Sequence, residues 1–136
     1  MEDSESQFQE LLAHFAARVN KALAAREAMV LCLFLRADGG VDVAAGIANT
    51  ANERAEVLNA MQASAKTQVS DESIEAICIA YPDSSNQAYV ALLENRDNYC
   101  AKVIVPIVMH PDPELDFENI DIQDGDVYVF PYVDAE

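Results

Sequence analysis

The sequence predicts a single α+β domain in which two helices pack on an antiparallel sheet. The chain has 136 residues, which suits one domain over residues 1–136 with one hydrophobic core. Its apolar fraction of 51% can fill such a core despite a formal net charge of −16. The apolar residues come in short helix-like or strand-like blocks. The predicted order is α-β-β-α-β-β-β, followed by an acidic loop and one more strand.

A first helix is predicted over Ser4–Arg26. Acidic residues lead this segment and basic residues close it, which suits the helix dipole. Its apolar residues recur at a spacing of three and four, as on one face of a helix. These residues are Phe8, Leu11, Leu12, Phe15, Val19 and Leu23.

A β-hairpin and a second helix are predicted next. The continuous apolar run Ala28–Leu35 indicates a central strand, and the Asp-Gly-Gly sequence at 38–40 suits a tight turn into a partner strand, Val41–Ile47. Thr50 and Glu53 have the spacing of a capping box, so the second helix should run from there to about residue 66.

The second half of the chain predicts an antiparallel meander and a final strand. The meander strands are Ile74–Tyr81, Ala88–Glu94 and Tyr99–Met109, and the final strand is Val127–Val133. Pro106 and Pro131 favour edge or bulged strands, because proline cannot donate to the ladder. This order of elements resembles the topology of roadblock-like and profilin-like folds, and the resemblance implies a small scaffold or dimerisation module.

The charge balance narrows the classes of partner. With 8 basic against 24 acidic residues, direct binding to nucleic acid or to an anionic membrane is disfavoured, and a basic protein is the natural complement. General solubility and adaptation to a high-salt cytoplasm are competing explanations of this acidity. The longest apolar runs fall far short of the roughly 20 residues that a bilayer crossing needs, and the acidic N-terminus lacks a secretory pattern. We therefore expect a cytoplasmic protein.

Catalytic and cofactor patterns are weak, so we expect a non-enzymatic protein without cofactor or metal. Cys32, Cys78 and Cys100 form no C-x-x-C pair and are expected to be buried free thiols. His14 lies off the apolar stripe of the first helix, and His110 ends a strand beside prolines. Cys100 and His110 bound one predicted strand, which would separate them by roughly 33 Å.

Two glycine-containing sequences also fail as ligand sites. The turn at residues 38–40 has no following Lys-Ser/Thr and precedes a strand, unlike a phosphate-binding loop. The carboxylates at 121–126 surround a glycine and could attract Ca²⁺, but their spacing departs from an EF-hand, so a plain acidic turn is favoured.

The strongest anomaly is the one-signed C-terminal part. After Lys102 the chain has nine of its 24 acids and no lysine or arginine. In an extended backbone, four of these acids would lie on one side at spacings of about 6.7 Å. They are Asp112, Glu114, Asp116 and Glu118. Such a row could present carboxylates to a basic groove. The alternative interpretation is an acidic loop that is simply exposed to solvent.

The predicted final strand adds an aromatic face. Tyr128, Phe130 and Tyr132 alternate with valines, and the rings would be exposed beside the acidic loop if the valines face inward. Ring anchors with a charged rim are typical of protein-binding patches. The predicted partner-binding residues are therefore Asp112, Glu114, Asp116, Glu118, Asp121, Asp124, Asp126, Tyr128, Phe130 and Tyr132.

These features predict a binding protein that occupies a basic surface of its partner. The partner would be a nucleic-acid-processing enzyme, inhibited by DNA mimicry, or a basic toxin neutralised by an immunity protein. The alternative function is the roadblock-like scaffold, which would act as a homodimer through sheet or helix pairing.

Overall fold

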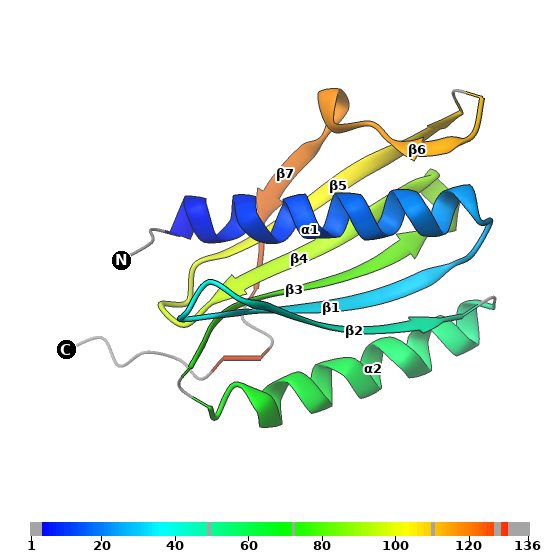
Figure 1. Cartoon of the computed structure of the whole chain (residues 1–136). Helices are drawn as coiled ribbons and strands as arrows, with labels where there is room; N and C mark the ends of the chain where they lie inside the picture. The colour runs from blue at the N-terminus through cyan, green and yellow to red at the C-terminus, as the bar shows by residue number, and fades with distance from the viewer. Residues whose placement is uncertain (1–3, 49, 72, 110, 127–128, 131–136) are drawn as a thin grey trace.

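The computed structural model describes residues 4–48, 50–71, 73–109, 111–126 and 129–130, and it confirms a single α+β fold (Figure 1). A seven-stranded antiparallel sheet has the strand order β2-β1-β3-β4-β5-β6, and β7 also pairs with β5. The helices are α1 (Ser4–Ala24) and α2 (Ala51–Gln68), with short 3-10 turns η1 (Ser84–Asn86) and η2 (Phe117–Asn119). The strands are β1 (Met29–Arg36), β2 (Val41–Ile47), β3 (Ile74–Asp83), β4 (Ala88–Asn95), β5 (Cys100–Met109), β6 (Pro113–Leu115) and β7 (Asp121–Asp124).

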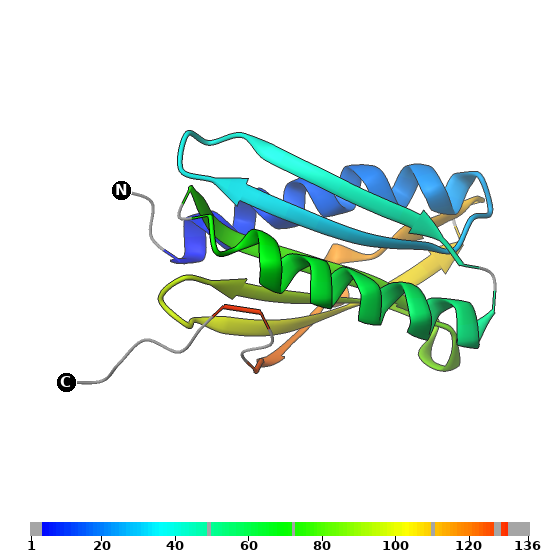
Figure 2. The same cartoon turned by 90° about the horizontal axis from the view of Figure 1, so that it is seen from below.

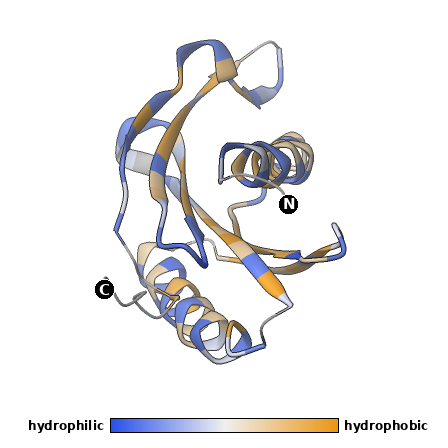
Figure 3. Ribbon diagram, turned by 90° about the vertical axis from the view of Figure 1, so that its left-hand side faces the viewer, coloured by the Kyte–Doolittle hydropathy of each residue, from blue (hydrophilic) through white to orange (hydrophobic). Residues whose placement is uncertain are grey.

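Helix α1 covers the concave face of the curved sheet (Figure 3). The predicted apolar stripe is confirmed, because Leu11, Phe15 and Val19 are fully buried. They pack against alternate residues of the strands, such as Leu31 and Leu33 of β1. This layer is the larger of the two apolar cores.

Helix α2 lies on the opposite face and covers less of it (Figure 2). The predicted cap is confirmed, since the Thr50 hydroxyl accepts a hydrogen bond from the Glu53 N–H at 3.1 Å. Ala65 is the buried residue within this helix, and it packs against the other side chains of β1 and β3. Val129 and Phe130 belong to the same core, so they complete the layer that α2 leaves open.

The prediction that Pro106 marks an edge or a bulged strand is wrong, because β5 lies inside the sheet and keeps a continuous register with β4. Strand β5 lies inside the sheet, with β4 on one side and both β6 and β7 on the other. The Pro106 carbonyl accepts from the Asp116 N–H at 2.8 Å, so the proline nitrogen faces that same outer side. There β7 stops pairing at Ile104 and β6 begins at Ile107. The N–H group that proline lacks would therefore point between β7 and β6, where neither strand pairs with β5.

The predicted final strand is also misplaced. The acidic connection, which was predicted to be a loop, forms β6, η2 and β7. Of the predicted strand Val127–Val133, the structure describes Val129 and Phe130, and these form a bend. Tyr128, Pro131 and Tyr132 lie outside the described residues.

Tyr89 closes the end of the β1–β3 ladder and gives a first prediction. Its buried hydroxyl donates to the Met29 carbonyl at 2.8 Å and accepts from the Met29 N–H at 3.2 Å, two residues before β1 begins to pair with β3 at Leu31. Tyr89→Phe leaves both groups without this partner and should lower the free energy of unfolding by about 2 kcal/mol. Urea denaturation measures the loss. The exposed Tyr99→Phe is the matched control, and equal effects of the two would contradict this role.

Candidate functional site

The candidate site is an acidic edge of the sheet, which we define as residues 111–126. It contains β6, η2 and β7 and lies along the outer side of β5 (Figure 1). Strand β7 pairs with the first half of β5, from Ala101 to Ile104, and β6 pairs with the second half, from Ile107 to Met109. Gly125 follows β7 so closely that a Cβ there would lie 2.8 Å from the Ala101 nitrogen. Glycine is thus required for this approach to β5.

Apolar side chains hold the acidic edge against the main core. Pro113 and Leu115 are buried, and the Leu115 N–H donates to Asn20 Oδ1 of α1 at 2.8 Å. The Phe117 ring meets the Phe15 ring edge-on, with centroids 6.2 Å apart. Apolar residues therefore face the core between the acids from Asp112 to Glu118, whereas Ile122 of β7 is 63% exposed and β7 is held by its pairing with β5.

Most of the predicted acidic residues are brought together on this edge. Exposed side chains are found at Asp112, Glu114, Glu118, Asp121, Asp124 and Asp126. The predicted single row of four acids is wrong, because the chain leaves the extended conformation after Asp116, where η2 begins at Phe117. The Asp116 carboxylate caps η2 by accepting from the Glu118 N–H at 3.1 Å and from Asn119 Nδ2 at 2.6 Å.

The carboxylates of the acidic edge have little cationic compensation. Within the described residues, Asp112 is the member with an ion pair, an exposed contact of 3.9 Å to Arg26. Lys102 lies opposite Gln123 in the β5–β7 register. Like charges held together with few cationic side chains among them raise the local negative potential, which favours binding of a cationic group.

Phe117 lies between two hollows and is not among the residues predicted for the site. A hollow of about 530 Å³ is lined by Val108 and residues 114–119, and it contains the acids Glu114, Asp116 and Glu118. On its other side, a shallow apolar hollow of about 310 Å³ is lined by Phe117 and by residues of α1. The ring is 37% exposed. Its sequence signal was the alternation of apolar residues with acids at 113–117.

Phe130 is buried in the second core and therefore leaves the predicted exposed patch. Its side chain is 3% exposed, and the Arg96 guanidinium lies 5.1 Å from the ring centroid. The buried Glu94 carboxylate accepts from the N–H of Val129 at 3.1 Å and also from that of Phe130. The sequence did not indicate that these contacts join residues 129–130 to β4.

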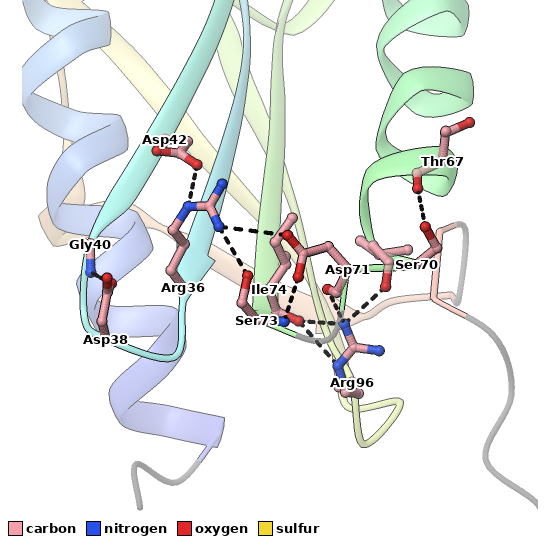
Figure 4. A network of polar contacts seen from close by, with 11 residues as sticks. Arg36, Asp38, Gly40, Asp42, Thr67, Ser70, Asp71, Ser73, Ile74 and Arg96 are labelled. Carbon is pink, nitrogen blue, oxygen red and sulfur yellow. Dashed lines mark hydrogen bonds and ion pairs between the residues drawn. The ribbon is translucent and has the colours of Figure 1, made fainter.

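Two arginines, Arg36 and Arg96, stabilise the fold through hydrogen bonds at a place away from the acidic edge (Figure 4). Arg96 donates to the carbonyls of Val69, Asp71 and Ile74 at 2.6–3.1 Å, which fixes the end of α2 to the start of β3. Arg36 donates to the Asp42 carboxylate and to Ser73 Oγ, and this joins the β1–β2 hairpin to the same place. Hydrogen bonds from Ser73 lower the pKa of the Asp71 carboxyl, and the two arginines lower it further.

The described residues do not assemble a recognisable catalytic site. Burial first, and then the carboxylates of Glu94 and Asp126, raise the pKa of the half-buried Cys100 thiol to about 11, which makes it a poor nucleophile at neutral pH. His14 is half-exposed and lies 3.6 Å from Glu10 on α1. His110 lies outside the described residues. Within the described ranges no group of three His, Cys, Asp or Glu side chains is placed to hold a metal ion.

The comparisons with known proteins assign no family. The chain matches no protein-family model, and neither a curated protein nor a solved structure matches it. The resemblance to roadblock-like and profilin-like topology therefore stays a prediction. Over the described part of the chain, no helix has both the length and the apolar character needed to cross a membrane.

Proposed function

We propose that the protein is a non-enzymatic binding module whose acidic edge docks onto a basic surface of a partner protein. The observation that carries this proposal is the placement of six exposed carboxylates along an edge that apolar contacts at Leu115 and Phe117 and the β5–β7 pairing fix to the rest of the fold. A surface that is ordered before binding loses little conformational entropy when a partner docks. A loop that served only solubility would not need the core contacts that Leu115 and Phe117 make.

The chemistry of the edge suits lysine or arginine side chains beside an apolar group. The hollow lined by Glu114 and Glu118 can receive a cationic side chain, and the half-exposed Phe117 ring supplies adjoining apolar surface. Aromatic residues surrounded by a polar rim often dominate the binding energy of an interface. Phe117 thus takes the role predicted for Phe130, while Tyr128 and Tyr132 lie outside the described residues and stay predicted partner-binding residues.

The proposed partner is a nucleic-acid-processing enzyme or a basic toxin. The groove of such a protein is complementary to closely spaced negative charges, which phosphates provide in DNA and carboxylates provide here. Complementary charge increases the association rate and makes binding weaken with salt. We place this function in the cytoplasm, a location supported by the three free cysteines.

Two variants of equal net charge test whether the edge, rather than total acidity, binds the partner. Each replaces four exposed acids by the corresponding amides, so each has a net charge of −16 + 4 = −12. The edge variant carries Glu114→Gln, Glu118→Gln, Asp121→Asn and Asp124→Asn. The control variant carries Glu10→Gln, Glu27→Gln, Glu56→Gln and Asp97→Asn, at positions on α1, α2 and two turns.

The expected result is a loss of partner binding that is specific to the edge variant. The wild type and the control should capture the same basic proteins from lysate at low salt and release them at high salt. The edge variant should bind at least about tenfold more weakly, since four charges at an interface act together. Equal capture by the two variants would show that only total acidity matters. Capture unaffected by salt would also contradict the proposal.

A further inference from the structure

Strand β2 is the open edge at the end of the sheet opposite β6. It pairs with β1 on one side, and in the described structure no strand pairs with its other side (Figure 2). Its seven residues include neither lysine nor proline, and its pairing with β1 runs without a bulge from Met29↔Ile47 to Leu35↔Val41. Edge strands usually avoid pairing with other chains by means of charged side chains, proline or bulges, and the one charged side chain of β2, Asp42, accepts a hydrogen bond from Arg36 of β1. The edge of β2 is therefore ready to accept another strand.

The hydrogen bonds to β1 fix which backbone groups of β2 face outward. The Ala48 N–H donates to the Ala28 carbonyl, and the Arg36 N–H donates to the Gly40 carbonyl, each at 2.8 Å. Because hydrogen-bonded and non-hydrogen-bonded pairs alternate in an antiparallel ladder, even-numbered residues of β2 bond to β1. The odd-numbered residues direct their N–H and C=O groups outward. They are Val41, Val43, Ala45 and Ile47.

We propose that β2 pairs antiparallel with β2 of a second copy of this chain, about a two-fold axis through Ala44. Outward-facing residues must meet outward-facing residues across the new ladder. The register centred on Ala44 satisfies this condition, pairs Val43 with Ala45 and Val41 with Ile47, and includes all seven residues of both strands. It can form up to about eight backbone hydrogen bonds.

The side chains of β2 are complementary to themselves in this register. Val43 and Ile47 are 36% and 45% exposed on the face that carries α1, and each would gain an apolar neighbour from the other copy. Asp42 would lie across from Gly46, and Ala44 across from Ala44. A register centred on Asp42 would instead oppose two acids. This fit favours a second copy over an unrelated peptide.

The paired sheets would carry an acidic edge at each far end, because β2 and β6 terminate the sheet on opposite sides. Two chains of net charge −16 repel one another, so added salt should strengthen self-association. Added salt should instead weaken the binding of a basic partner to the acidic edge. The two proposals are thus independent and can fail separately.

Sedimentation over a range of concentrations and salt tests the pairing. The wild type should approach twice its mass of 14.9 kDa as concentration and salt rise. Ala45→Pro removes an outward N–H, and Val43→Lys places a charge on the edge, so both should remain monomeric while keeping the native circular dichroism. Ile122→Lys, at an exposed β-branched residue of β7, is the matched control and should still dimerise.

Cysteine cross-linking tests the register. Ala44→Cys should form an intermolecular disulfide, because residue 44 would meet its own copy in a pair with Cα atoms about 4.5 Å apart. Val43→Cys and Ala45→Cys should cross-link far less. The background carries Cys32→Ala, since Cys32 lies opposite Ala44 on β1, and Cys100→Ser. A wild type that stays monomeric, a dimer that survives both edge variants, or preferential cross-linking at 43 or 45 would overturn the proposal.

Discussion

Glu94→Ala is expected to release residues 129–130 from the sheet and to cost about 3 kcal/mol of stability. The Glu94 carboxylate is 3% exposed and accepts from the backbone N–H groups of Val129 and Phe130. Removing it leaves buried donors without this partner, and hydrogen bonds to a charged group are among the stronger ones. The loss should also uncover the Phe130 side of the second core.

A double-mutant cycle with Phe130→Ala tests whether Glu94 acts through this segment. If it does, the two substitutions should cost less together than the sum of their separate effects, because either one undocks the same residues. Chemical denaturation gives the energies, and limited proteolysis follows the C-terminal segment. Asp97→Ala, an exposed acid in the next turn, is the control and should be close to neutral. Additive costs would show that Glu94 stabilises the fold by another route.

Alkaline pH is expected to unfold the protein through its buried thiols. Burial raises the pKa of Cys32 from 9.0 to about 12, and burial with the neighbouring Cys32 raises that of Cys78 even further. A raised folded-state pKa gives stability that is complete below the unfolded-state value and is lost as pH rises above it. Between pH 9 and the folded-state values, each thiol should remove about 1.4 kcal/mol per pH unit.

The combined effect of the two thiols should reach roughly 5 kcal/mol by pH 11, which is comparable with the whole stability of an ordinary domain. Denaturant midpoints measured in reductant from pH 8 to pH 11 give the slope. Cys32→Ala and Cys78→Ala should each reduce the slope by about 1.4 kcal/mol per pH unit, whatever their cost at pH 8. A flat profile for the wild type, or an unchanged slope in the variants, would contradict the expected titration.

The elements predicted best are those with a strong local pattern. The three-and-four spacing of Phe15 and its neighbours predicted α1, and Thr50 with Glu53 predicted the start of α2, because periodicity and capping depend on nearby residues. The turn at Gly39, with φ of 90°, followed in the same way from local chemistry. These predictions needed no knowledge of distant contacts.

The sequence could not predict which segment pairs with the outer side of β5, because that choice depends on contacts between residues far apart in the chain. The valine and tyrosine run at 127–133 has higher strand propensity than the Asp-Ile-Gln-Asp sequence of β7, yet β7 occupies the position beside Ala101–Ile104. Strand propensity depends on context, and here Gly125 permits the close backbone approach. Glu94 looked like the end of an ordinary strand, since the amides it binds lie 35 and 36 residues away.

The acidic site was predicted in its composition and only partly in its geometry. Glu114 lies on the exposed side of β6, as its alternation with apolar residues indicated, and the exposed Asp112 lies in the bend before that strand. The turn at Asp116 depends on its capping bonds, and the position of Phe117 depends on Phe15 of α1, which lies about a hundred residues earlier. A single sequence does not indicate that second contact.

The central claim is that the acidic edge is a binding surface, and residue-resolved NMR titration tests it most directly. The probe is a short lysine peptide with a phenylalanine in its middle, added to the ¹⁵N-labelled protein at low and at high salt. We expect the largest shift changes at residues 112–124, with Phe117 among them, and their loss at high salt and in the edge variant. Shifts spread equally over the exposed acids of α1 and α2, or confined to those helices, would contradict the claim.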